Sequence, residues 1–363
     1  MERLKKILFV SGFLPSHRVP SGGQKLVYRI LNELTATHEV TLLAFCNEKE
    51  LPYLDASDFK SCAQVKIFTI KEVSRAYFAM RYPHLPMIAC ARYGMAADWL
   101  RQALGQKTYD LAWFEFIQSA SLLSLLPPGL PSRLVVHDLF FQAHERKAAQ
   151  AKGLAKRFWQ WEAVRTKRWE SKAILAAKEV CTLTDKDRQV AQEITGRRDI
   201  GLRYPEVDHF YHEIGRSRGP EIVRGKILFW GQMSRRENED AVIWFVREIL
   251  PLIRSHRPHG KLVIAGANPS AAVLHLADDK VEVTGFVADP ISLFTSTEIA
   301  IAPLRLGAGI KIKVAEYLAA KVPTVATTVG AEGIRSSPLL HTADDAVGFS
   351  QACIALMAPS SHA

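Results

Sequence analysis

The sequence predicts an α/β protein made of two doubly wound parallel-sheet domains. The chain has 363 residues, enough for two domains that each bury a core of their own. Short apolar strand patterns alternate with helical patterns in both halves, which is typical of parallel strands joined by helices. Between residues 203 and 224 this alternation stops. We therefore predict an N-terminal domain over 1–205 and a C-terminal domain over 206–363, with a linker over 206–224.

The first half contains six predicted strands separated by helical segments. Each strand is a short apolar run bounded by charged or turn-forming residues. The predicted strands are Ile7–Val10, Glu39–Phe45, Val65–Phe68, Leu111–Phe114, Leu134–His137 and Glu179–Thr184. The main predicted helices are Gln24–Ala36, Ala91–Ala103, a long basic segment after Phe141, and Asp185–Thr195. This order predicts a parallel sheet with helices on its faces.

The second half repeats the alternation with five predicted strands. They are Lys226–Trp230, Lys261–Ala265, Val281–Thr284, Glu298–Ala302 and Pro323–Thr327. A helix over Asn238–Ser255 has apolar residues at helical spacing, which gives it one buried face. A last helix is predicted at about Asp344–Met357. Ligands of such sheets bind outside the carboxyl ends of the strands.

The composition argues against a membrane-spanning or metal-binding protein. No run of about 20 apolar residues is present, which a membrane-spanning helix would need. The five cysteines are scattered without a C-x-x-C pair, which favours reduced thiols in a cytoplasmic protein. Two His-x-x-His pairs lack further ligands nearby. We therefore predict no metal site.

Positive charge is concentrated in residues 141–172. The chain has a formal net charge of +10, and this segment interleaves basic residues with four aromatic ones: Phe158, Trp159, Trp161 and Trp169. Two interpretations fit. The aromatic residues pack on the domain and the cations are solvated, or the helix contacts an anionic membrane from the cytoplasmic side. Nucleic acid binding is not predicted.

A glycine-rich loop in the second half predicts an anion site. Gly307, Ala308 and Gly309 follow the strand Glu298–Ala302, and the loop continues through Ile310 into a helix. The N–H groups and dipole of a helix N-terminus attract anions. Lys311 adds a full positive charge, and the Glu316 carboxylate lies where it can accept two sugar hydroxyls. This layout suits a nucleotide diphosphate.

The combined pattern resembles the retaining glycosyltransferases of family 4, the glycosyl transferases group 1. The matching segments are Ile227–Ser270, Val281–Asp289, Cys181–Val190 and Pro205–Phe210, together with the glycine loop. The resemblance implies the GT-B fold, in which two Rossmann-like domains face each other across a cleft. It implies that the N-terminal domain binds the acceptor and the C-terminal domain binds the nucleotide sugar.

The resemblance also implies roles for residues of the second half. Glu316 would bind the ribose, and Lys311 with Arg236 would neutralise the diphosphate, Arg235 being the alternative to Arg236. Lys313 is expected to touch the surface. Backbone groups of Gly285, Phe286 and Val287 would recognise the base. The family pairs two glutamates eight positions apart, and Ala308 stands in place of the first, which leaves the choice of donor sugar open.

In the first half, Gly22 and Gly23 precede a helix and would allow a phosphate or sugar to approach its N-terminus. The spacing does not match G-x-G-x-x-G, so a nicotinamide cofactor is not predicted. His137 ends a predicted strand, where the family often has a histidine at the donor sugar or reaction centre. Glu115 is a weaker candidate at the end of the neighbouring strand.

The implied function is transfer of a sugar from a nucleotide diphosphate sugar to a saccharide or lipid-linked acceptor. The anomeric configuration is kept, and neither a metal nor a separate cofactor is needed. Synthesis of bacterial surface polysaccharide or glycolipid is the implied context. The alternatives are a non-catalytic GT-B partner subunit and a nucleotide-sugar epimerase.

Overall fold

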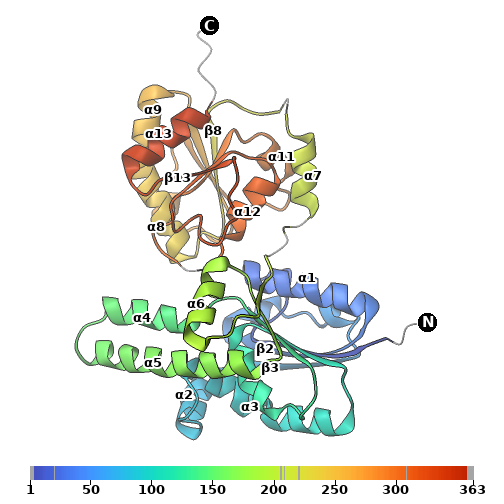
Figure 1. The fold of residues 1–363 in the computed structure, drawn as a ribbon. Helices are drawn as coiled ribbons and strands as arrows, with labels where there is room; N and C mark the ends of the chain where they lie inside the picture. Colours follow the sequence, from blue (N-terminus) through green and yellow to red (C-terminus); the bar gives the residue numbers. More distant parts are fainter. Residues whose placement is uncertain are drawn as a thin grey trace. The chain divides into compact units, whose positions relative to one another are not determined.

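The structure, a computed structural model, consists of two α/β units. It describes residues 4–19, 21–204, 207, 209–219, 221–307 and 309–357. The chain divides into compact units Met1–Pro205 and Glu206–Ala363 (Figure 1). Every strand pairing among the described residues is parallel. The predicted fold class is therefore confirmed.

The first unit contains a seven-stranded sheet in the order β3-β2-β1-β4-β5-β6-β7. Its strands are β1 (Lys6–Ser11), β2 (Glu39–Asn47), β3 (Gln64–Ile70), β4 (Leu111–Glu115), β5 (Ser132–Val136), β6 (Glu179–Thr182) and β7 (Ile200–Leu202). The first six occur where the sequence predicts them. β7 was not predicted, because three residues are too short to show a period.

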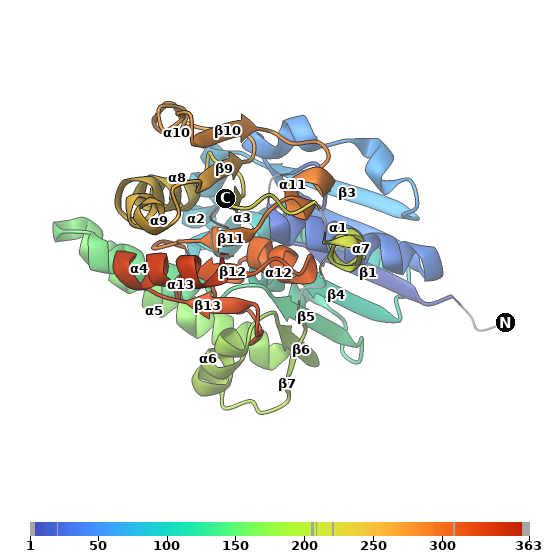
Figure 2. The same cartoon turned by 90° about the horizontal axis from the view of Figure 1, so that it is seen from above.

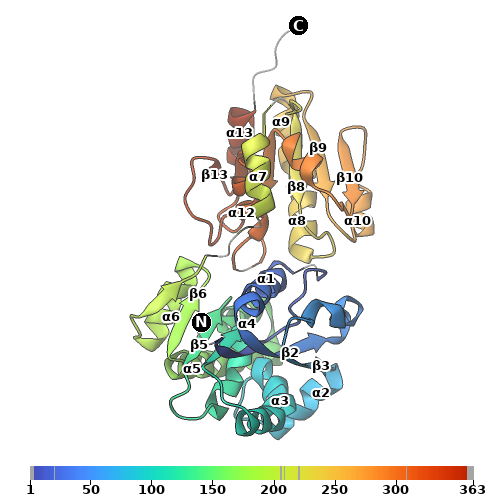
Figure 3. The same ribbon diagram turned by 90° about the vertical axis from the view of Figure 1, so that its right-hand side faces the viewer.

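Helices cover both faces of this sheet. They are α1 (Gly22–Thr37), α2 (Glu72–Arg81), α3 (Met87–Gln106), α4 (Phe140–Gln150), α5 (Gly153–Ala176) and α6 (Asp185–Thr195), with shorter 3₁₀ turns η1 (Glu48–Tyr53), η2 (Ala56–Phe59) and η3 (Ile117–Leu125). α1 packs its apolar stripe on one face, and α3, η3, α5 and α6 cover the other (Figure 3). α2 packs on α3.

The basic segment after Phe141 forms two helices, where the sequence predicted one long helix. α4 ends at Gln150 and α5 begins at Gly153. Gly153 has φ +59, a left-handed conformation that costs little without a Cβ atom. The chain therefore turns between two helices that pack against each other.

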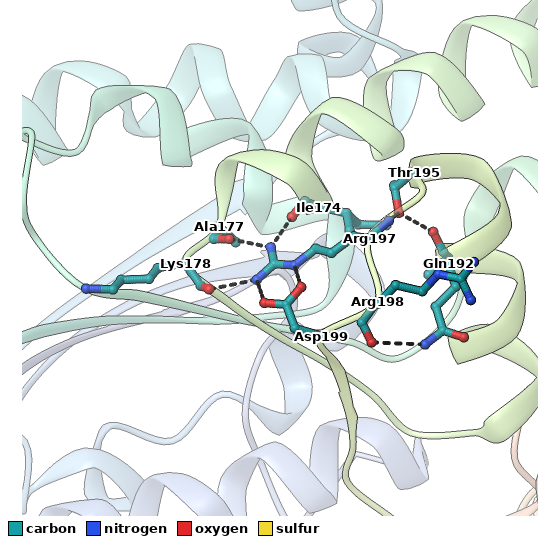
Figure 4. Close-up of polar contacts among 9 residues, drawn as sticks. Ile174, Ala177, Lys178, Gln192, Thr195, Arg197, Arg198 and Asp199 are labelled. Atoms are coloured by element: carbon teal, nitrogen blue, oxygen red, sulfur yellow. Dashed lines mark hydrogen bonds and ion pairs between the residues drawn. The ribbon is translucent and has the colours of Figure 1, made fainter.

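Arg197 fixes the end of α5 (Figure 4). Its guanidinium donates hydrogen bonds to the carbonyl oxygens of Ile174, Ala177 and Lys178, and it forms an ion pair with Asp199. The last carbonyl groups of a helix have no partner within the helix. Arg197 supplies these missing donors and ties α5 to the segment that leads into β7.

We expect Arg197→Ala to destabilise the first unit. Three carbonyl groups would lose a charged donor, which should lower the free energy of unfolding by about 2 kcal/mol. Urea denaturation measures this change. The matched control is Arg198→Ala, since Arg198 is exposed and only its backbone accepts a hydrogen bond, from Gln192. Equal urea midpoints for the two variants would contradict this role of Arg197.

The second unit contains a six-stranded sheet in the order β10-β9-β8-β11-β12-β13. Its strands are β8 (Lys226–Trp230), β9 (Lys261–Ala265), β10 (Val281–Gly285), β11 (Ile299–Ala302), β12 (Thr324–Ala326) and β13 (Leu340–Thr342). The helical elements are α7 (His209–Ser217), α8 (Arg236–Trp244), a π-turn η4 (Phe245–Ile249), α9 (Leu250–His256), α10 (Ala271–Leu274), α11 (Ile291–Thr295), α12 (Ile312–Ala319) and α13 (Ala346–Leu356). α8, α9 and α13 cover one face, and α7, α11 and α12 cover the other (Figure 2).

Two local predictions in this unit need correction. The stretch predicted as a linker contains α7, which packs through Tyr211 and Ile214 into the core of the second unit. The predicted helix Asn238–Ser255 is interrupted by the π-turn η4. Pro251 lies just after this turn and has no N–H to donate to the carbonyl four residues earlier, so the hydrogen-bond pattern changes there.

Candidate functional site

The candidate site lies at the carboxyl ends of the second unit's strands. β8, β9, β10 and β11 run parallel, so their following loops lie at one edge of the sheet. This is the edge at which open α/β sheets bind ligands. The glycine loop follows β11 and leads into α12.

The ends of β8, β9 and β10 touch backbone to backbone. A Cβ atom on Gly266 would lie 1.8 Å from the carbonyl oxygen of Gly231, so no larger residue fits there without a backbone shift. The Gly266 N–H donates to the Gly285 carbonyl at 2.9 Å, and the Gly231 N–H donates to Ala265 at 2.9 Å. These contacts pack the ends of the three strands closely against one another below the loops.

Lys313 points into this site, although the sequence predicted that it touches the surface. Its Nζ lies 4.2 Å from the centroid of the Phe229 ring and donates to Oδ1 of Asn238 at 2.6 Å. A Cβ atom on Gly231 would lie 2.8 Å from this Nζ, so glycine at 231 leaves room for the ammonium group. Burial lowers the pKa of Lys313 to about 7.

Other charged groups surround Lys313. The charges of Arg235 and Lys311 lower its pKa further, and those of Glu237 and Glu316 raise it. The charges of all four residues therefore act on Lys313. The structure thus brings together Lys311, Glu316 and Arg235, which the sequence predicted as ligand-binding residues, and adds Lys313 to them.

Lys311 occupies the N-terminal cap position of α12. Its Nζ donates to the carbonyl of Gly309 at 2.6 Å and lies 3.6 Å from Oε2 of Glu332. A cation at a helix N-terminus is unfavourable by itself because it opposes the helix dipole. A bound anion would be attracted both by the Lys311 ammonium group and by the N-terminus of α12, which would offset this cost.

The glycine loop has the backbone that the prediction requires at two positions. Gly307 and Gly309 have φ +109 and +73, in the left-handed region that favours glycine. A Cβ atom on Gly307 would lie 3.9 Å from Cβ of Glu237, so this loop runs beside the start of α8. Ile310 is half-buried. Ala308 lies outside the described residues.

The two candidate arginines differ in position. Arg235 lies before α8, and its Nε is 3.4 Å from Oε1 of Glu237. Arg236 is exposed at the first position of α8, and among the described residues it has no contact with the cluster around Lys313. The sequence analysis preferred Arg236 to Arg235. In the structure it is the charge of Arg235 that acts on Lys313.

The loop after β10 presents an aromatic ring. Phe286 is 77% exposed, and Val287 packs against the core of the second unit. Gly285 between strand and loop has φ +70, and its carbonyl accepts from Gly266. The exposed Phe286 ring is a feature that the sequence pattern alone did not distinguish from a core residue.

In the first unit, His137 forms a buried chain of hydrogen bonds with two residues of β4. Its Nε2 lies 2.7 Å from Oε2 of Glu115, and the Trp113 indole Nε1 donates to Oε1 of Glu115 at 2.8 Å. Glu115 is fully buried. A carboxylate oxygen can accept the hydrogen bond of an imidazole N–H, so this contact favours the His137 tautomer with its proton on Nε2.

The other ring nitrogen of His137 faces the start of α1. A Cβ atom on Gly23 would lie 3.4 Å from Nδ1 of His137, and α1 begins at Gly22. The Phe116 ring stacks on the imidazole at 3.9 Å, and Phe116 has φ +66, a strained conformation for a non-glycine residue. Nδ1 of His137 therefore lies beside a helix N-terminus that has no acidic residue in its first turn.

Trp113 was not identified from the sequence. Alternate residues of a strand share a face, so Trp113 and Glu115 on β4 point the same way. That spacing was the available signal. His137, which follows β5, and Glu115 were each predicted as candidates, but their hydrogen bond to each other was not.

Two features are absent from the described residues. No group of three or more histidine, cysteine, aspartate or glutamate residues is arranged to hold a metal ion within the described ranges. None of the helices in the described part of the chain combines the length and apolar character needed to cross a membrane.

Comparison with known proteins gives a family match and structural neighbours. Residues 224–359 match the family model described as glycosyl transferases group 1. Among curated protein sequences, none matches the chain significantly.

Among solved structures, Anabaena HepE in complex with UDP has a TM-score of 0.59 at 13% identity, with 95% of this chain and 88% of that chain covered. Sucrose-phosphate synthase from Thermosynechococcus elongatus has a TM-score of 0.62 at 15% identity, covering 96% and 88%. The lipopolysaccharide outer core galactosyltransferase WaaB in its apo form has 0.56 at 12%, covering 97% and 90%. These neighbours confirm the predicted GT-B fold of two Rossmann-like units.

Proposed function

We propose that this chain transfers a sugar from a nucleotide diphosphate sugar to an acceptor hydroxyl. The match of residues 224–359 to the family model of the group 1 glycosyltransferases supports this proposal. The observation that carries this proposal is the cluster of Lys313, Lys311 and Arg235 at the strand ends. It combines positive charge, a helix N-terminus and a nearby carboxylate, Glu316, which together match a diphosphate and a ribose.

Lys313, a half-buried lysine, is central to the proposal. A buried ammonium group is stable in its charged form only when an anion compensates the lost hydration. The pKa of Lys313 falls to about 7 in the ligand-free protein because the nearby acids do not fully compensate it. A bound diphosphate would supply the missing charge, with Lys311 and Arg235 beside it.

We assign the remaining donor contacts to neighbouring groups. Glu316 would accept hydrogen bonds from the ribose hydroxyls. The base would lie at the loop after β10, against the exposed ring of Phe286 and backbone groups of Gly285–Val287. The neighbour HepE has been crystallised with UDP-glucose, and we propose a UDP-hexose as the first donor to test.

The proposed reaction keeps the configuration of the transferred sugar. The bond between the anomeric carbon and the diphosphate oxygen breaks, the acceptor oxygen forms its bond on the same face, and the acceptor proton passes to a phosphate oxygen of the leaving nucleotide. Lys313, Lys311 and Arg235 would stabilise the negative charge that develops on that leaving group. Protein cations would thus stabilise the leaving group, a role that a metal ion has in other transferases.

We assign the acceptor to the first unit. His137 would accept a hydrogen bond from a sugar hydroxyl through Nδ1, with Glu115 holding the required tautomer. Gly22 and Gly23 leave space at the start of α1 for a sugar or phosphate to approach. We propose a saccharide or lipid-linked acceptor of surface polysaccharide or glycolipid synthesis, and the neighbour WaaB is a lipopolysaccharide galactosyltransferase.

We expect Lys311→Ala and Glu316→Ala each to lower sugar transfer by about 100-fold, because each removes a group that binds or stabilises the nucleotide. Thermal-shift screening against UDP, GDP, ADP and their sugars identifies the donor, and product release from that donor measures turnover. Lys280→Ala, an exposed lysine of the same unit, serves as the control. Wild-type rates in both variants would rule out this site, and isomerised donor without transfer would indicate an epimerase.

A further inference from the structure

The acidic residues of α5 are all turned inward. Glu162 is fully buried. It accepts a hydrogen bond from the Met87 N–H at 2.7 Å and forms an ion pair with Arg165 at 2.7 Å. Glu170 is fully buried and accepts from the N–H groups of Phe140 and Phe141 at the start of α4. The helix contains no other acid.

All exposed charged residues of α5 are therefore basic. Its basic side chains are Lys156, Arg157, Arg165, Lys167, Arg168 and Lys172, and five of the six are exposed while Arg165 is half-buried. A charge count along the sequence understates this, because it includes Glu162 and Glu170. The surface that meets solvent attracts anions without an opposing acid.

α5 also exposes an apolar stripe. Leu154, Phe158 and Trp161, which are between 41% and 81% exposed, recur at i, i+4 and i+7 and so share one helix face. The other aromatic residues of the basic segment are accounted for by packing. Trp159 lies against His144 and Lys147, and Trp169 packs on the core. The packing interpretation thus explains one set of aromatic residues and leaves this stripe unexplained.

A second apolar stripe lies on α2. Val73, Tyr77 and Met80 also recur at i, i+4 and i+7, and they are 56% to 81% exposed. α2 has no buried residue and includes the basic residues Arg75 and Arg81. Nothing in the described part of the chain covers this face.

The loop between α2 and α3 links α2 to α5. The Arg165 guanidinium donates to the carbonyl of Pro83 at 2.9 Å, and the Met87 N–H donates to Glu162. Leu85 of the same loop belongs to a small core that Phe78 of α2 and Trp169 of α5 join. Hydrogen bonds and this small core therefore connect α2 with α5, the two helices that carry the stripes.

We propose that α2 and the N-terminal half of α5 form a docking surface for an anionic lipid bilayer. Exposed aliphatic and aromatic side chains with basic neighbours are what an interfacial helix presents to lipid, because the apolar residues insert and the cations meet headgroup phosphates. A nucleic acid would use the charge but would leave Leu154, Val73 and Met80 without a role. The surface goes beyond the proposed reaction and does not depend on it.

Vesicle sedimentation tests the proposal with the full chain. We expect binding to vesicles of phosphatidylcholine mixed with phosphatidylglycerol, weaker binding to phosphatidylcholine alone, and loss of binding at high salt. The paired changes Phe158→Ser with Trp161→Ser, Tyr77→Ser with Met80→Ser, and Lys156→Glu with Arg157→Glu should each lower the partition coefficient by about tenfold.

The matched control changes two exposed apolar residues of the second unit, Leu274→Ser with Val347→Ser, and should bind vesicles like the wild type. Thermal unfolding and nucleotide binding should be unchanged in all variants, which separates this surface from the proposed donor site. Unchanged vesicle binding by the α2 and α5 variants would overturn the proposal. So would equal binding to neutral vesicles, dimers that the α2 or α5 changes abolish, or binding of a single-stranded oligonucleotide in place of vesicles.

Discussion

Lys313→Met is expected to weaken nucleoside diphosphate binding and to lower kcat/KM by about 100-fold. Methionine keeps most of the side chain against Phe229 and removes the ammonium group that would face the diphosphate, together with its hydrogen bond to Asn238. Isothermal titration with the donor nucleotide and steady-state turnover measure the two effects. The thermal midpoint of the ligand-free variant should be no lower than that of the wild type, because an incompletely compensated buried charge is lost.

The pKa of Lys313 makes binding depend on pH. In the free protein this pKa is about 7, and in the unfolded chain it is about 10.4. Between these values the unfolded chain binds the extra proton, so the contribution of Lys313 to stability rises with pH over this window and falls as pH drops toward 7. A bound diphosphate would raise the pKa again, so binding at pH 8 should take up a proton.

Affinity for the nucleotide should therefore decline by up to about tenfold per pH unit above pH 7 in the wild type. Lys313→Met should lose that proton-linked part of the pH dependence. Titration in two buffers with different ionisation enthalpies measures the proton uptake. Wild-type affinity in Lys313→Met, with the same proton uptake, would contradict the assignment of the diphosphate to this lysine.

Glu115→Gln is expected to lower turnover by about 100-fold with little change in donor binding. The Trp113 indole must donate to the side chain at 115, so the glutamine carbonyl oxygen would face Trp113. Its amide group would then face Nε2 of His137 and donate to it. Nε2 would become an acceptor, the proton would move to Nδ1, and His137 would no longer accept a hydrogen bond there.

A second substitution should reverse part of this loss. In Trp113→Phe with Glu115→Gln, no indole N–H fixes the glutamine, so its amide can turn and its oxygen can accept from Nε2 of His137. We expect recovery of about tenfold relative to Glu115→Gln. Nitrogen-15 NMR of the His137 ring reports the tautomer in each variant. No loss in Glu115→Gln, or a double variant no faster than the single one, would contradict the positioning role of Glu115.

The fold could be predicted from local patterns, because most strands are short apolar runs between turn residues. β1, β8 and β9 lie where the sequence places them, since each is buried on both faces and lacks competing helical periodicity. α7 was missed because few of its described residues are apolar and face the core, chiefly Tyr211 and Ile214 with Phe210 beside them. The break before α5 depends on the backbone conformation of Gly153, which composition does not reveal.

The candidate site could be predicted only in part. The glycine loop, Lys311 and Glu316 are close in sequence, so their proximity follows from one helix turn. The burial of Lys313 depends on Gly231 and Asn238, which lie about 80 residues earlier, and a local pattern shows no such contact. The chain from Trp113 through Glu115 to His137 likewise depends on the pairing of two strands.

The backbone contact between Gly266 and Gly231 limits how new donor specificity can arise in this protein. Any side chain at either glycine would push β8 and β9 apart or displace Lys313, so substitutions there should cost stability and charge together. For the proposed donor site, we therefore expect changes in nucleotide choice to arise at the rim, where Phe286 projects into solvent. Libraries aimed at a different donor should randomise that rim and keep both glycines.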